Sequence, residues 1–235
     1  MLNYRFDWAV VTSGKYYEWL VSGVTVTIKL SLVSISLAFL LGLVIAVMRM
    51  SRLRPVRWFA HGYLEFFRNT PLLVQLFFWY FGSYKILPQA VNDWLVRQDF
   101  EFAAAVIALT IYTSAFIAED IRSGVRSIPK EQMEAARSSG FSYIRSMQYI
   151  ILPQAVRLTI PPLINQFLNL MKNSSLAMTI GVAELMYQAR QVESYTFKGF
   201  EAFSAATLVY LALSFTITGL MTLYDKTVLR PLKGR

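Results

Sequence analysis

The sequence predicts an all-α integral membrane protein with about five transmembrane helices. Of the 235 residues, 55% are hydrophobic and only 16% are charged. The apolar residues gather in long runs, and most of the basic residues lie between those runs. A soluble domain of this size normally carries fewer apolar and more charged side chains. We therefore take a lipid bilayer as the solvent for this chain.

Five apolar runs are candidates for the spans, because a helix needs about 20 apolar residues to cross a hydrocarbon core of about 30 Å. Pro71 removes an amide donor and disfavours helical geometry at the residue before it, so we expect an interrupted second span. Polar residues from Lys172 to Ser175 are expected to interrupt the fourth. The predicted spans cover approximately residues 21–48, 58–87, 102–118, 160–182 and 203–224.

Lys and Arg are distributed unevenly over the connections between these spans. Fourteen of them fall in the segments 49–57 and 119–160 and in the C-terminal tail. The other connections hold six, offset by eight acidic residues. Because positive charge marks the cytoplasmic side, we expect the N-terminus outside and the C-terminus in the cytoplasm. The start of the chain lacks the pattern of a removable signal peptide, so the internal spans are expected to direct targeting.

The sequence lacks the residues that several kinds of catalytic and binding site require. There is no cysteine and only one histidine, His61, which excludes thiolate sites and histidine clusters. The phosphate-binding pattern G-x-x-x-x-G-K-[ST] is absent, since the only Gly-Lys pair, Gly14-Lys15, is followed by Tyr16. We expect no enzyme activity, no bound metal or cofactor and, because the basic residues do not gather on a soluble face, no nucleic-acid partner.

The connection after the third span, residues 119–159, is longer than a tether between membrane helices needs to be. Pro129 favours a helix start, and Gly140 suits a left-handed cap at the helix end. A second short helix is predicted at residues 142–151, ending at Pro153. These helices would offer small residues to a groove on a partner. A solvated connection that only joins two spans is the alternative.

The same loop carries a specific motif. Glu134-Ala135-Ala136 is followed after three residues by Gly140, after nine more by Ile150, and one residue later by Leu152-Pro153. This run resembles the EAA signature of bacterial ABC-importer permeases, a family in which the loop is a coupling helix that sits in a cleft of the ATPase subunit. The resemblance implies that four residues couple this chain to an ATPase dimer: Glu134, Ala135, Ala136 and Gly140.

Two further stretches extend the resemblance over nearly the whole chain. The run from Phe67 to Gln75, FRNTPLLVQ, is similar to the second-span motif of polar amino acid permeases. The stretches 169–175 and 179–181 look most like the permeases of glutamate/aspartate importers. The resemblance thus implies import of glutamate or aspartate across the bacterial inner membrane, with glutamine or a basic amino acid as the alternative cargo.

The family also implies partners. ATP and Mg would bind to the separate ATPase subunits, and a second permease chain, preferably a homologous one in a heterodimer, would complete the pathway. An extracytoplasmic amino-acid-binding protein would deliver the cargo and set most of the selectivity. Membrane lipids would surround the spans, and the whole chain, residues 1–235, would form a single transmembrane domain.

Ionisable residues inside spans are costly and usually face an interior cavity. Lys29 lies near the outer end of its span, and its long stem favours snorkelling to the headgroups. Arg68 precedes the break at Pro71, where a restarting helix would offer amide groups and a positive dipole end to a carboxylate. Lys172 has polar neighbours in the fourth span. The predicted substrate pathway comprises Arg68, Asn69, Thr70, Gln75, Asn169, Lys172, Asn173 and Ser174.

Two alternatives remain open from the sequence. Polar groups in membrane helices also hold helices together, and this structural role would explain the same residues. A secondary transporter driven by an ion gradient is the alternative of a different class. It is disfavoured because many such transporters contain two internal repeats, and no convincing repeat is present here.

Overall fold

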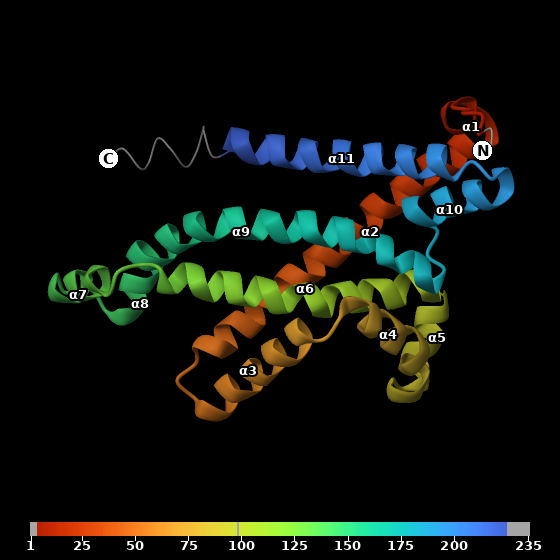
Figure 1. The fold of residues 1–235 in the computed structure, drawn as a ribbon. Coiled ribbons are helices and arrows are strands. Elements are labelled where there is room, and N and C mark those ends of the chain that lie inside the picture. Colours follow the sequence, from red (N-terminus) through yellow and green to blue (C-terminus); the bar gives the residue numbers. More distant parts are fainter. Residues whose placement is uncertain (1–3, 98, 225–235) are drawn as a thin grey trace. The chain divides into compact units, whose positions relative to one another are not determined.

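The computed structural model describes residues 4–97 and 99–224, and every regular element in these ranges is helical (Figure 1). The predicted all-α class is therefore confirmed. The basic tail after Tyr224, which served to orient the chain, lies outside the described residues. In chain order the helices are α1 (Ala9–Thr12), α2 (Gly14–Met50), α3 (Arg54–Asn69), α4 (Leu72–Ile86), α5 (Gln89–Arg97), α6 (Phe100–Arg126), α7 (Lys130–Ser138), α8 (Tyr143–Ser146), the π-helical η1 (Met147–Ile151), α9 (Leu152–Asn173), the 3-10 helix η2 (Ser174–Ile180), α10 (Leu185–Thr196) and α11 (Gly199–Tyr224).

Three of the described helices, α2, α6 and α11, are long and apolar enough to cross a membrane by themselves. At 1.5 Å per residue the 37 residues of α2 extend about 55 Å, so this helix must tilt or project beyond the hydrocarbon core. The other two predicted spans are composite. Extended backbone at Thr70 separates α3 from α4, and α9 tightens into η2 at Ser174.

The chain packs as two compact units, each built from three separate stretches of sequence. Among the described residues, unit 1 holds 4–35, 72–97 with 99–109, and 168–220. Unit 2 holds 36–71, 110–167 and 221–224. Helices α2, α6 and α9 each continue from one unit into the other.

Small residues predominate on the buried face of α2. Positions three or four apart lie on one side of a helix, and here most of the residues on the buried side are small or polar. The opposite side carries exposed large residues such as Leu32, Phe39 and Leu40. This distribution is typical of a membrane helix, whose large side chains meet lipid while small ones let neighbouring backbones approach. Its small and polar members are Gly23, Thr27, Ser31, Ser34, Ala38, Gly42 and Ala46, and its large members are Leu20, Leu30 and Ile45.

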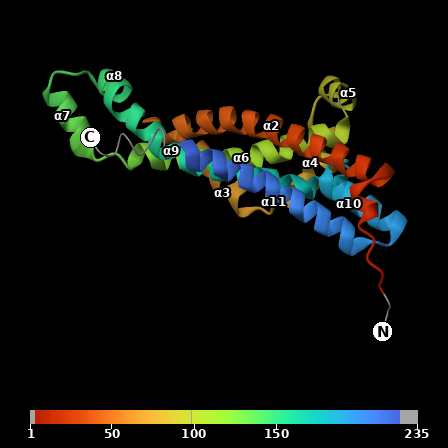
Figure 2. The same cartoon turned by 90° about the horizontal axis from the view of Figure 1, so that it is seen from above.

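The core of unit 1 lies where α10 packs against the first turns of α2 and α11, and both views of the ribbon place these segments together (Figures 1 and 2). Leu185 and Val192 of α10 are fully buried there, beside Leu20 of α2 and Ala202 of α11. The approach of α2 is close, because a Cβ atom added at Gly23 would lie 2.8 Å from the Cα atom of Leu185.

A fully buried carboxylate, Glu184, joins the three helices of this core. It caps the start of α10 by accepting a hydrogen bond from the Tyr187 amide at 2.7 Å, and it accepts a second from the Tyr210 hydroxyl of α11 at 2.7 Å. The Thr27 hydroxyl of α2 lies 3.5 Å from the same carboxylate and accepts from the Leu185 amide at 3.1 Å. A buried carboxylate needs such donors to offset its loss of hydration.

Unit 2 also depends on close helix contacts. Ile45, Ala46, Ala60, Leu64 and Ala118 form a buried cluster from α2, α3 and α6. A Cβ atom at Gly42 would approach Ile117 of α6 within 2.7 Å, and one at Gly124 would approach the Thr159 hydroxyl of α9 within 2.0 Å. Glycine at these two positions therefore sets the spacing of α6 from its neighbours.

The close approach at Gly23 leads to a testable prediction. Gly23→Ala should lower the melting temperature of the detergent-solubilised protein, because the methyl group meets backbone atoms of Leu185 that cannot rotate away. We expect a cost of about 1–3 kcal/mol, typical of overpacking. The matched control is Gly219→Ala in α11, where a Cβ atom meets nothing within 4 Å. This control should be neutral or slightly stabilising, and equal melting temperatures for the two variants would contradict the packing.

Burial raises the pKa of the Glu184 carboxyl, so the folded chain holds this proton more tightly than the unfolded chain does. The free energy of unfolding should then fall as pH rises from the ordinary pKa of about 4.5 through the raised value. Glu184→Gln, which cannot ionise, should gain melting temperature relative to wild type over this interval. The exposed Glu131→Gln should show no such gain.

Removing the acceptor altogether has a different expected result. Glu184→Leu would remove the acceptor of the Tyr210 hydroxyl and the Tyr187 amide, at roughly 1–3 kcal/mol for each group left unpaired. Its melting temperature should therefore lie well below that of Glu184→Gln at every pH. Similar values for the Leu and Gln variants would show that the carboxylate does not organise the core.

Candidate functional site

The loop between α6 and α9 has a defined structure within unit 2. Helix α7 ends at Ser138, and Gly140 has a φ of +87°, the left-handed conformation predicted for it. The Phe141 amide donates to the Ala136 carbonyl and the Gly140 amide donates to the Arg137 carbonyl, both at 3.1 Å. This pair of bonds is a Schellman motif, which closes the helix at a glycine.

The loop also has an apolar core of its own. Ile128, Ile151 and Ala155 are buried together, and Met133 of α7 and Met147 of η1 pack against them. Ser142 caps the start of α8, and its hydroxyl accepts from the Arg145 amide at 3.3 Å. Figure 1 shows α7 and α8 side by side beyond the end of α6. A connection with its own core can move as a body, whereas a solvated tether cannot.

The four predicted coupling residues differ in their exposure. Glu134, Ala135 and Gly140 are exposed, and a Cβ atom at Gly140 would meet nothing within 4 Å. Ala136 does not share this surface, which corrects the expectation that all the small residues face outward. It is only 4% exposed, because it lies one turn after Met133 and shares its inward face. Glu134, Ala135 and Gly140 thus remain the surface available to a partner.

The second helix of the loop does not end at Pro153. Instead α8, η1 and α9 form one uninterrupted helical run, and the amide of Leu152 donates to the Met147 carbonyl five residues back. A π-helical turn is wider than an α-helical one, so it accommodates the missing amide of the proline. The Gln154 side chain also donates to the Ile150 carbonyl at 2.7 Å. The loop is therefore joined directly to α9.

Three of the predicted pathway residues lie at the end of α3, in unit 2. Asn69 donates to the Glu65 carbonyl at 2.7 Å and Thr70 donates to the Phe66 carbonyl at 2.7 Å, so both side chains help to close the helix. Arg68 is exposed, and its guanidinium lies 5.4 Å from the centre of the Phe116 ring of α6. Of the three, Arg68 is the one whose charged group extends to another helix.

The other five pathway residues lie in unit 1. Asn169 and Lys172 are exposed on one side of α9, and Asn173 is its half-buried last residue. Ser174 is buried in η2 and donates to the Met171 carbonyl at 2.7 Å. Gln75 is 4% exposed in α4, which packs against η2. Lys29, for which snorkelling is expected, lies in the same unit with its ammonium 5.1 Å from the Phe102 ring.

Two carboxylates near the end of α6 were missed from the sequence. Glu119 pairs with Arg122, whose Nε atom donates to it at 2.8 Å. Asp120 is half-buried and accepts from the Gln166 side chain of α9 at 2.8 Å. Gln166 and Asp120 are 46 residues apart, so no local pattern could pair them. The sequence signal that could have identified them is a pair of adjacent acidic residues in a helix that is otherwise apolar enough to span the membrane.

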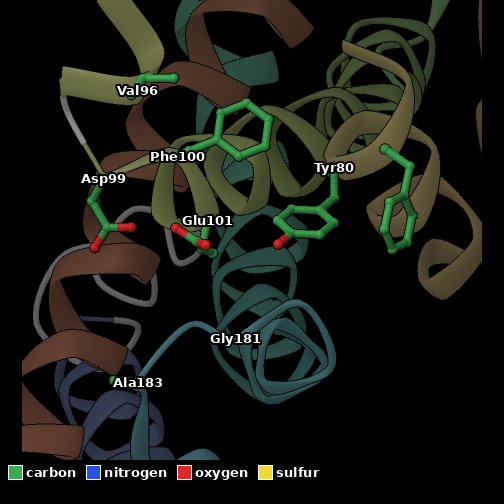
Figure 3. Close-up of a pocket in the computed structure, with 8 residues that line it drawn as sticks. Tyr80, Val96, Asp99, Phe100, Glu101, Gly181 and Ala183 are labelled. Atoms are coloured by element: carbon green, nitrogen blue, oxygen red, sulfur yellow. The ribbon is translucent and has the colours of Figure 1, made fainter. Parts of the chain in front are cut away.

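Unit 1 also has a cavity of about 830 Å³ where α4, α5, the start of α6 and the turn after η2 meet. Figure 3 shows the carboxylates of Asp99 and Glu101 beside the rings of Phe100 and Tyr80. Acidic and aromatic groups suit a cation better than an anion. None of the predicted pathway residues is among the lining residues, which are Tyr80, Phe81, Val96, Asp99, Phe100, Glu101, Gly181 and Ala183.

Known proteins resemble this chain over most of its length. The probable glutamine ABC transporter permease protein GlnM of Bacillus subtilis (strain 168) is 48% identical over 82% of this chain and 85% of its own. The glutamate/aspartate import permease protein GltJ of Escherichia coli (strain K12) is 34% identical over 92% of this chain and 89% of its own. Both identities extend well beyond the coupling loop.

A solved structure agrees with these likenesses. A chain in the crystal structure of an amino acid ABC transporter with histidines is 34% identical, with a TM-score of 0.85 over 96% of this chain and 100% of that one. Residues 38–230 match the family described as "Binding-protein-dependent transport system inner membrane component". The chain therefore belongs to this family, and its relatives here are amino-acid ABC transporter permeases, as the EAA motif and the second-span motif together implied.

Proposed function

We propose that this chain is the membrane-spanning permease subunit of an ATP-driven importer of a polar amino acid in the bacterial inner membrane. The observation that carries the proposal is the folded loop between α6 and α9. Its EAA motif is closed by Gly140 in the left-handed conformation and supported by a core of its own. The names of the relatives support the amino-acid class of the cargo.

The loop is the proposed contact with the ATPase. Glu134 and Ala135 offer a charged and a small exposed side chain on α7. The space around the Cα atom of Gly140 is open. We place this loop and the C-terminus in the cytoplasm and the N-terminus outside, on the distribution of Lys and Arg. ATP and Mg would then act on the partner subunits, and this chain would contribute no catalytic group of its own.

Transport would use two permease chains and a binding protein outside the membrane. Closure of the ATPase dimer would draw the paired loops together and turn the spans from an inward-facing to an outward-facing arrangement. A homologous second permease is our preferred partner. Because the loop continues into α9 without a break, its motion would pass directly to the helix that carries Asn169 and Lys172.

The identity of the transported amino acid is the most specific part of the proposal. The sequence stretches 169–175 and 179–181 favour glutamate or aspartate, whereas the relative at 48% identity is named for glutamine. Glutamine and glutamate share the α-ammonium and α-carboxylate groups and have nearly the same shape. We therefore propose glutamine first and the acidic amino acids second, because the higher identity extends over most of the chain.

The coupling assignment predicts the result of a pull-down. Tagged wild-type chain extracted from its native membrane with mild detergent should bring down an ATPase. Gly140→Asp should lose it, because the new carboxylate occupies open space on the proposed contact surface. Asp tolerates the left-handed conformation better than most residues, so the loop itself should stay folded.

The matched control adds the same charge elsewhere. Gln89→Asp changes an exposed residue at the start of α5, at the opposite end of α6 from the loop. This variant should retain the ATPase. If no ATPase accompanies even the wild-type chain under conditions that preserve known complexes, the importer assignment fails and a gradient-driven transporter takes its place.

The pathway assignment predicts the effect of removing a membrane cation. Arg68→Met or Lys172→Met should lower amino-acid uptake at least tenfold by removing a charged partner of the substrate carboxylate. The amount of chain in the membrane and of captured ATPase should stay the same. Lys29→Met, which removes a cation placed over Phe102, is the control and should transport normally. Loss of assembly in the first two variants would instead identify their role as structural.

A further inference from the structure

Asp120 is a carboxylate near the end of α6 with polar and charged neighbours on other helices. It lies in α6, one of the helices that can span the bilayer, and it is half-buried. Its carboxylate accepts a hydrogen bond from the Gln166 side chain of α9 at 2.8 Å. Asp120 lies two residues beyond the predicted span 102–118, and a carboxylate that is partly buried there needs donors to offset its lost hydration. This hydrogen bond fixes the direction of the group without neutralising its charge.

Arg68 is the cation that acts on Asp120. Its guanidinium stacks 5.4 Å from the centre of the Phe116 ring, and Phe116 precedes Asp120 by one helical turn on the same face of α6. Side chains four residues apart in a helix have Cβ atoms about 5–6 Å apart. Arg68 therefore lies close enough to act electrostatically on Asp120. Among the residues described, however, the two groups do not come within the 4.0 Å of an ion pair.

The charge of Arg68 also acts on the neighbouring carboxylate, Glu119, but the hydrogen bonds of Glu119 go to a different cation. Glu119 is already paired with Arg122, three residues later on the same helix, through hydrogen bonds from two guanidinium nitrogens. Glu119 and Arg122 thus balance each other within α6. In the described part of unit 2, Arg68 and Asp120 are then a cation and an anion held near each other, each without an ion pair of its own.

This arrangement is complementary to an α-amino acid. Such a molecule carries a carboxylate and an ammonium on one carbon, so it can accept from a guanidinium at one end and donate to a carboxylate at the other. Charge-assisted hydrogen bonds of this kind are about 2.7–2.9 Å long. Since the two groups are too far apart for a direct ion pair, neither already satisfies the other in the way that such a ligand would.

We propose that Asp120 binds the α-ammonium group of the transported amino acid while Arg68 binds its α-carboxylate, and that Gln166 is a positioning residue that holds Asp120. The inference rests on the proposed function, since it assigns a part of the same pathway. It adds a carboxylate to a pathway whose predicted charged members were all cations. Recognition of both groups would distinguish an amino acid from a simple carboxylic acid, whatever its side chain.

The test compares two ligands that differ only in the ammonium group. Tritiated L-glutamine and tritiated glutaramate, which is glutamine without its α-amino group, are bound to the complex of permease and ATPase in lipid nanodiscs. Wild type should prefer glutamine. Asp120→Asn should weaken glutamine binding about 10- to 100-fold and leave glutaramate nearly unchanged, so the preference disappears. A merely structural role would weaken both ligands equally and leave their ratio intact.

Two further variants sharpen this result. Glu119→Gln, which alters the adjacent carboxylate, should leave the preference for glutamine as it is in wild type. Gln166→Leu keeps the Asp120 carboxylate but removes its hydrogen bond, and it should reduce the preference about 3- to 10-fold. If Asp120→Asn does not assemble, the preference measured for Gln166→Leu tests the proposal instead.

The remaining outcomes separate this inference from the proposed function. An unchanged preference in Asp120→Asn, or an equal loss of both ligands, overturns the role of Asp120. If the wild-type complex contains its ATPase but binds neither ligand, the amino-acid site in this chain is refuted while the coupling assignment stands. If no ATPase is captured at all, the importer assignment itself has failed.

Discussion

In a lipid solvent, apolar side chains gain little by contacting one another, so this fold depends on how closely its helices can approach. Hydrocarbon tails are as apolar as leucine, and helix association relies instead on van der Waals contact and interhelical hydrogen bonds. Gly23 brings α2 against the backbone of α10 in unit 1, and Gly42 and Gly124 bring α6 against α2 and α9 in unit 2. Each contact requires the absence of a side chain, which explains why small residues predominate on the buried face of α2.

Close approach in turn decides which polar groups meet. In unit 1, the contact at Gly23 brings the Thr27 hydroxyl to the amide that begins α10, and Glu184 completes the junction with Tyr210. In unit 2, Glu119 is matched by Arg122 on its own helix. These groups have donors or counter-charges and serve the fold. Arg68 and Asp120 differ because their charges are balanced only at a distance, which is the condition that favours a ligand carrying both charges.

The sequence predicted the parts of the fold that depend on composition and local conformation. Apolar length located α2, α6 and α11, and the positive φ of Gly140 followed from its place after a short helix. The ends were less accurate because helices continue beyond the apolar core. Helix α6 extends to Arg126 rather than 118, supported by the Glu119–Arg122 pair one turn apart.

The parts of the fold that depend on tertiary contacts could not be predicted from the sequence. No spacing rule connects Asp120 with Gln166, and Glu184 was counted only as an acidic loop residue although three helices meet on it. Pro153 was taken as a helix end because proline usually is one, whereas the π-helical turn before it keeps the run intact. In each case the missing information was the identity of a neighbour distant in sequence or an uncommon hydrogen-bonding pattern.

The continuity of α9 has a mechanical consequence for the proposed transport cycle. A rigid helix transmits displacement along its axis, and here the run from Tyr143 to Asn173 connects the loop core in unit 2 with the polar residues in unit 1. Pro161 and Pro162 interrupt its backbone hydrogen bonds shortly before the boundary at residue 167. Proline is one of the usual causes of a kink in a helix. The same helical run thus carries the loop at one end and Asn169 and Lys172 near the other, with one weak point at Pro161 and Pro162.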